Sequence, residues 1–173
     1  MAQQKILNNN SLAFIGLCNE YCQSVENARE MDRSDFVAAM LRILPRIYIT
    51  ATDVNTDAAL IEEAYIDSHL EEDYYEALRR NIENLLGPDD TYLEVFEEDM
   101  KYSDTPIAAS VSEGLADLFQ VFYNFLESIK DVPEELVEQG IVAVKEDFET
   151  YWSRILCNLL RPLNQIRYSS EES

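Results

Sequence analysis

The sequence is poor in residues that make turns, since only 4 of its 173 residues are glycine and 5 are proline. An all-β domain needs a turn every ~8–12 residues, and turns depend on glycine, proline and asparagine. Leucine, alanine, glutamate and arginine, which favour helices, are common instead. We therefore predict an all-α protein, a single antiparallel bundle of five or six helices. It forms one domain over residues 1–173, with its core at 11–168 and a loose tail at 169–173.

Long apolar runs are also missing, and none approaches the ~20 residues that cross a bilayer. A short apolar run at 12–18 ends in Cys18 and faintly resembles a lipoprotein signal. Lys5 is the only basic residue before it, and Leu17 stands where a small residue is needed. The cysteines are odd in number, Cys18, Cys22 and Cys157, so we expect reduced thiols and a cytoplasmic protein.

Positive charge is scarce, because 13 Lys and Arg residues face 34 Asp and Glu residues, for a formal net charge of −21. Since 47% of the residues are hydrophobic, the chain is not a disordered acidic tail. The excess lies in the middle, where residues 62–149 hold 25 acidic and 5 basic residues. Residues 1–61 and 150–173 are nearly neutral. We expect an acidic flank made by the middle helices, which repels nucleic acids and anionic membranes.

Apolar residues at three- and four-residue steps predict a first helix that begins at Asn10 or Ser11. A second helix begins at Ser34 or Asp35, and Pro45 kinks or breaks it because proline lacks a backbone donor. Residues 53–70 then form a loop with one helical turn.

Capping-box spacings predict two further helix starts, at Ser68 and at Ser110. The helix from Ser68 ends at Gly87, and the helix from Ser110 is apolar over a wide arc, which places it at the centre of the bundle. Between them the pattern indicates a shorter helix over 92–100 and a loop over 102–106. A long last helix starts after Asp131 and Pro133 and runs to Leu160, and Pro162 kinks or ends it.

Motifs that would indicate a metal or a catalytic group fail on inspection. Residues 53–57 space their oxygen ligands as a calcium loop does, but Ala58 and Ala64 stand where glycine and glutamate are needed. His69 is the only histidine, and zinc needs three or four ligands. Cys18 and Cys22 belong to an apolar helix face, where cysteine packs as a small hydrophobe. We predict no catalytic residue, no metal site and no cofactor.

The arginines suggest one candidate pocket. Arg42 and Arg46 lie one turn apart on the second helix, and Arg154 and Arg161 lie two turns apart on the last. If these helices pack together, the guanidinium groups converge on an anion. The walls would be Tyr48 and Trp152, with Asp117 as a polar partner. The competing interpretation is salt bridges to the many carboxylates.

Four segments resemble a bacterial helical family, the one catalogued as domain of unknown function five-zero-six-three. They are Leu-Pro-Arg-Ile-Tyr at 44–48, Tyr-Leu-Glu-Val-Phe at 92–96, Ser-Glu-Gly-Leu-Ala-Asp-Leu-Phe at 112–119, and Leu-Leu-Arg at 159–161. The resemblance extends over residues 12–168. It implies an all-α bacterial protein and no known activity.

The chain departs from this family's pattern in the last helix, where members often carry histidines around the tryptophan and after the Leu-Arg pair. Tyr151, Ile155 and Asn164 take those places here. A metal or acid–base role that depends on such histidines therefore does not carry over.

Charge and the missing catalytic pattern favour a non-enzymatic interaction module that engages a basic protein, with imitation of DNA as a sharper variant. The alternative is a small-anion-binding protein or enzyme that uses the arginine pocket between the second and last helices. Neither interpretation involves direct nucleic-acid binding or a membrane, and the oligomeric state stays open.

Overall fold

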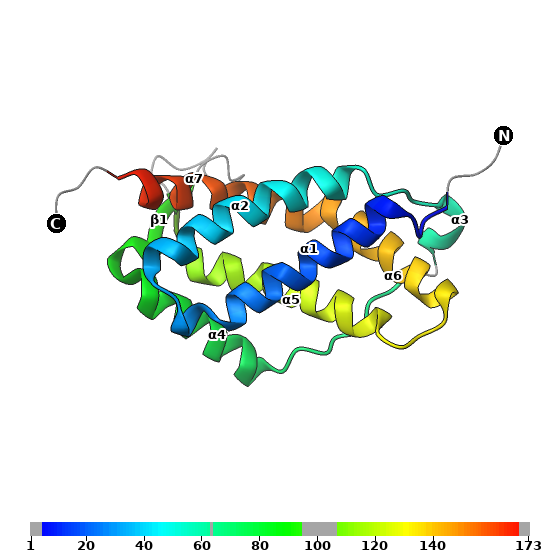
Figure 1. Ribbon diagram of the computed structural model, residues 1–173, viewed down its shortest axis with the longest axis horizontal. Coiled ribbons are helices and arrows are strands. Elements are labelled where there is room, and N and C mark those ends of the chain that lie inside the picture. Colours follow the sequence, from blue (N-terminus) through cyan, green and yellow to red (C-terminus); the bar gives the residue numbers. More distant parts are fainter. Residues whose placement is uncertain (1–4, 63, 95–106, 170–173) are drawn as a thin grey trace.

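Helices make up most of the chain in the computed structural model, which describes residues 5–62, 64–94 and 107–169 (Figure 1). The predicted helical bundle is confirmed. Its elements, in order, are α1 (Asn9–Glu26), a 3-10 turn (Ala28–Glu30), α2 (Arg33–Thr52), α3 (Ala58–Ile61), α4 (Glu72–Leu86), a 3-10 turn (Gly87–Asp90), β1 (Thr91–Glu94), β2 (Ile107–Ser110), α5 (Val111–Ile129), α6 (Glu134–Asp147), a π-helical turn (Phe148–Trp152) and α7 (Ser153–Tyr168). No helix within these residues is both long and apolar enough to cross a bilayer.

The first two helices pack against each other along their apolar faces. α1 begins earlier than predicted, because Asn8 caps it and forms a capping box with Ser11. α2 starts after Asp32 and continues to Thr52, so of the kink or break predicted at Pro45 the break does not occur. α2 packs on α1 and α7, and this packing holds the helix together where proline removes one backbone hydrogen bond.

The loop between α2 and α4 is held against α5 by side chains of α5. Asn124 Oδ1 accepts hydrogen bonds from the backbone N–H groups of His69, at 2.8 Å, and Leu70, at 2.9 Å. Ser128 Oγ accepts the N–H of Asp67 at 3.2 Å. The predicted helix start at Ser68 is wrong: α4 begins only at Glu72, without a side-chain cap. It ends as predicted at Gly87, whose φ of +60° suits glycine.

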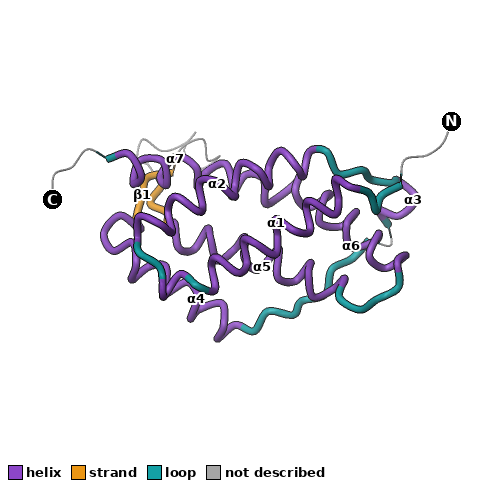
Figure 2. The backbone as a smooth tube through the Cα atoms, in the orientation of Figure 1, coloured by secondary structure: helices purple, strands orange, loops and turns teal. Residues whose placement is uncertain are grey.

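A short strand, β1, the first of a hairpin, occupies residues 91–94, where the sequence indicated the start of a helix over 92–100. β1 and β2 pair antiparallel, with Thr91 opposite Ser110 and Glu94 opposite Ile107. The rest of that predicted helix and the predicted loop over 102–106 lie outside the described residues. Figure 2 shows the two strands at one end of the bundle, beside α7.

The buried carboxylate of Asp90 fixes the base of this hairpin. It accepts hydrogen bonds from the N–H of Ser112, at 2.6 Å, and from the hydroxyls of Ser110 and Ser112, each at 2.8 Å. Ser110 Oγ also accepts the N–H of Glu113 at 3.2 Å, so the predicted N-cap of α5 is confirmed.

The predicted last helix is longer than expected. α6, the π-helical turn and α7 follow one another without a gap from Glu134 to Tyr168, and Pro162 does not end the helix. The indole N–H of Trp152, which is fully buried, donates to the carbonyl oxygen of Val144 at 3.0 Å. Trp152 packs edge-on against Phe122 of α5, with 5.0 Å between ring centroids, and stacks on Phe14 of α1 at 6.1 Å. The central position predicted for α5 fits these contacts.

Replacing Asn124 with alanine will release the loop before α4, because two backbone N–H groups lose their acceptor. We expect the free energy of unfolding to fall by about 1–3 kcal/mol, measured by urea denaturation. Limited proteolysis should cleave near residues 64–71 faster than in the wild type. Asn84→Ala, at an exposed position of α4, is the control. Equal stability of the two variants would contradict this role of Asn124.

Candidate functional site

A cavity of about 300 Å³ lies between the hairpin, the first turns of α5 and the first turns of α7. We call it the hairpin pocket. It is lined by Tyr92, Ala108, Ala109, Ser110, Glu113, Gly114, Asp117, Arg154, Ile155, Asn158 and Leu159. Its volume is at the lower end of the range for small-molecule sites.

Two contacts hold the walls of the hairpin pocket in place. Arg161 of α7 donates to the carbonyl oxygen of Leu93 in β1 at 2.5 Å, which ties the hairpin to α7. At the base, α5 and α7 approach closely, because a Cβ on Gly114 would lie 2.8 Å from Leu159 Cδ2. Together with the Asp90 hydrogen bonds, these contacts fix both ends of the hairpin relative to the two helices.

The charged groups of the hairpin pocket are two carboxylates from α5 and one guanidinium from α7. Glu113 and Asp117 lie one turn apart, and Asp117 Oδ1 accepts the phenolic O–H of Tyr75 at 2.6 Å. Burial raises the pKa of Asp117 above its usual value; the Tyr75 hydrogen bond opposes this shift and the Glu113 charge adds to it. Among the described residues, no carboxylate lies within ion-pair distance of Arg154.

The structure does not bring the predicted arginines together. Arg46 pairs with Glu20 at 3.6 Å and lines a groove between α1 and α2, so here the salt-bridge interpretation holds. Arg42 is exposed on α2. Arg161 binds the hairpin backbone, and Arg154 lines the hairpin pocket.

The two predicted aromatic walls also lie elsewhere. Trp152 is 0% exposed, and its indole N–H donates a hydrogen bond to the carbonyl oxygen of Val144, so it cannot contact a ligand that enters from solvent. Tyr48 is 38% exposed and packs edge-on against Phe148 at 5.2 Å. Of the seven predicted residues, Asp117 and Arg154 line a common cavity, the hairpin pocket.

Glu113, Asn158 and Tyr75 belong to the site but were missed from the sequence. Glu113 was assigned only to a helix cap, although it lies one turn before Asp117 and four-residue spacing places both on one face of α5. Asn158 stands in the same relation to Arg154 on α7. Tyr75 comes from α4, so only the fold reveals its contact with Asp117.

The cysteines and the histidine behave as ordinary structural residues. Cys18 and Cys22 are buried, and burial raises the pKa of each thiol well above its usual value. His69 is exposed and contributes its backbone to the loop contact with Asn124. Within the described residues, no three His, Cys, Asp or Glu side chains are placed to hold one metal ion.

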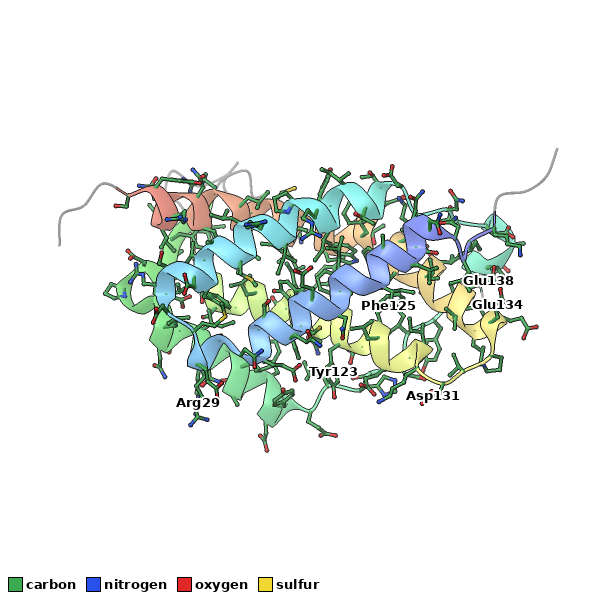
Figure 3. All side chains as sticks on the ribbon, viewed as in Figure 1. Arg29, Tyr123, Phe125, Asp131, Glu134 and Glu138 are labelled. Atoms are coloured by element: carbon green, nitrogen blue, oxygen red, sulfur yellow. The ribbon has the colours of Figure 1, made fainter. Side chains whose placement is uncertain are left out.

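Acidic residues gather along a second feature, where the loop before α4 runs beside the end of α5 and the start of α6 (Figure 3). We call it the acidic edge. It consists of Asp67, Glu71, Glu72, Asp73, Glu127, Asp131, Glu134 and Glu138. Burial is the largest cause that raises the pKa of Tyr123, and the charges of Glu127 and Glu71 raise it further. These two carboxylates therefore lie close to the same ring. No residue of the edge forms an ion pair within the described part of the chain.

The chain belongs to the family described as Domain of unknown function (DUF5063), whose model matches residues 5–169. This confirms the resemblance found in the sequence. The crystal structure of protein BF1032 from Bacteroides fragilis is similar, with a TM-score of 0.82 and 27% sequence identity over 98% of this chain and 99% of that chain. No curated protein matches the chain. The comparisons thus establish the fold and the family, whose function is unknown.

The three thiols will differ in reactivity. In the native protein near neutral pH, we expect only Cys157, which is exposed, to react with Ellman's reagent. Cys18 and Cys22 should react only after unfolding, because burial blocks access and disfavours the thiolate. A Cys157→Ser variant should show no reaction before unfolding; rapid native reaction of that variant would contradict the burial of α1.

Replacing Asp117 with asparagine will change how stability depends on pH. A pKa raised in the folded state means that Asp117 supports folding below the pKa of the unfolded chain, and that this support is lost as the pH rises through the folded pKa. Asparagine still accepts from Tyr75 but does not ionise. We expect the stability of Asp117→Asn relative to the wild type to increase between about pH 4 and pH 7, measured by urea denaturation. Asp35→Asn, at an exposed position of α2, is the control. A relative stability of Asp117→Asn that stays constant with pH would refute the shift.

Proposed function

We propose that this protein is a non-enzymatic binding protein of the cytoplasm that engages a basic partner protein through the acidic edge. One observation carries the proposal: the edge keeps carboxylates where helix stability alone disfavours them. Glu127 lies in the last turn of α5, and Asp131 follows two residues after its end. The negative end of a helix dipole disfavours anions and favours bases. The last turn itself has no basic residue, and Lys130, the C-cap residue that follows it, forms no ion pair among the described residues.

Other acids of the edge have a structural explanation and support the proposal less. Glu72 and Asp73 begin α4, and Glu134 begins α6, where the positive end of the helix dipole stabilises them. Asp67, Glu127 and Asp131 have no such benefit. Because none of the three forms an ion pair among the described residues, they add repulsion to the folded state that a basic partner would relieve.

The acidic edge is also placed on fixed elements. Asn124 and Ser128 hold the loop backbone on α5, so the carboxylates of the loop and of α5 keep their relative positions. A fixed array of like charges accelerates the encounter with an oppositely charged surface, and salt weakens that effect because the Debye length is only about 8 Å at physiological ionic strength.

Neutralising the edge should weaken binding of a basic protein more than an equal change of charge elsewhere. The edge variant combines Glu127→Gln, Asp131→Asn and Glu134→Gln. The matched control combines Asp35→Asn, Asp53→Asn and Glu149→Gln, all exposed positions away from the edge. Each triple variant changes the formal net charge from −21 to −18.

The probe is a fluorescent lysine-rich peptide, followed by anisotropy over a series of salt concentrations. We expect the edge variant to bind at least about tenfold more weakly, with a smaller salt dependence, and the control to change less than about twofold. Proteins captured from lysate by the wild type are then tested against both variants. Equal losses in the two variants would show that only total charge matters, and the proposal would fail.

A further inference from the structure

We propose that the hairpin pocket binds a small zwitterionic ligand, whose ammonium group faces Glu113 and Asp117 and whose carboxylate faces Arg154. This site is separate from the acidic edge, and it does not depend on the function proposed above. The inference rests on the charges that line the cavity, on the absence of ion pairs to them among the described residues, and on the volume of the cavity.

Among the described residues, no Lys or Arg forms an ion pair with the two carboxylates of the hairpin pocket. Asp117 is half-buried, and the Tyr75 hydroxyl occupies its Oδ1 atom. Its Oδ2 atom accepts no hydrogen bond from the described residues. Glu113 lies one turn away and adds a second negative charge. Two neighbouring carboxylates, one partly withdrawn from water, repel each other, and an ammonium group between them would offset that cost.

The opposite side carries the guanidinium of Arg154. A guanidinium presents several donors in a planar fork that matches a carboxylate. Arg154 has no ion pair with the two carboxylates that line the same cavity, so charges of both signs line the pocket without neutralising each other. A ligand with both charges satisfies both walls at once.

Two other cavities show why this arrangement is distinctive. The cavity beside α4, which Glu113 also lines, contains Arg79, whose guanidinium already binds Glu76 and Glu83 and forms no ion pair with Glu113. The groove between α1 and α2 contains Arg46, which pairs with Glu20. In both places the protein supplies the partner itself.

The volume and the apolar part of the lining limit the ligand to the size of an amino acid. A cavity of about 300 Å³ leaves space for a short aliphatic chain beside the charged ends. Ala108, Ile155 and Leu159 supply the apolar contacts for such a chain.

The probes are the ω-amino acids from glycine to 6-aminohexanoate, titrated into the full-length protein by calorimetry and by NMR of backbone amides. Pentylamine and pentanoate test each charge alone. We expect at least one ω-amino acid to bind with a Kd below about 10 mM, more tightly than either single-charge probe. The amide shifts should centre on Gly114 and Ala109. If every ω-amino acid fails to bind at that concentration, or if the shifts map elsewhere, the proposal is wrong.

Four variants identify the two walls. Asp117→Asn should lower the affinity for the tightest-binding ω-amino acid about tenfold or more and should also lower the affinity for pentylamine. The affinity for pentanoate should stay unchanged. Arg154→Gln should weaken the same ω-amino acid and pentanoate, while leaving pentylamine unchanged. Asp147→Asn and Arg42→Gln, which make the same chemical changes outside the pocket, should change affinity less than about twofold. Equal effects of pocket and control variants would overturn the assignment, and amide spectra of each variant verify its fold.

Discussion

The aromatic contacts around Trp152 are the constraint on which the rest of the fold depends, because they join three helices at one point. Phe14 of α1, Phe122 of α5 and Trp152 of the long C-terminal helix pack within 6.4 Å of one another, measured between ring centroids. All three rings are buried. Each ring contributes apolar area and specific geometry, so their packing sets the relative positions of α1, α5 and α7. α2 and α4 then cover this centre.

The packing of α5 against α7 around these rings also determines the shape of the hairpin pocket. α5 supplies its carboxylates and α7 supplies its arginine, and the two helices are held close where Gly114 meets Leu159. Asp90 and Arg161 attach the hairpin over this junction by polar contacts to the start of α5 and to β1. The core therefore positions the charged groups, and the polar contacts close the wall beside them.

Helix positions were predictable from the sequence, because an apolar stripe repeats at the helical period whatever it packs against. The hairpin was not. Tyr92 and Leu93 suit either a helix or a strand, and their partner strand starts only at Ile107. The predicted start of α4 at Ser68 was wrong for a similar reason. Asn124, on a helix far away in the sequence, accepts the loop N–H groups of His69 and Leu70, so this segment is a loop and Ser68 does not cap a helix. For the site, Asp117 and Arg154 were selected by residue type, and the four-residue spacing already places Glu113 beside Asp117 on α5. That Arg154 lines the same cavity depends on how α5 and α7 meet, which no local pattern encodes.

The π-helical turn at Phe148–Trp152 determines which face of α7 points toward the core. Such a turn holds one residue more than an α-helical turn, and one residue corresponds to about 100° of rotation around the helix axis. Loss of a single residue from this turn would rotate α7 by that amount relative to α6. Leu156, Leu159 and Leu163 would then leave the core, and Arg154 would leave the pocket. Chain length at this point is thus as constrained as residue identity, and related chains that keep this core should differ by substitutions here but not by deletions.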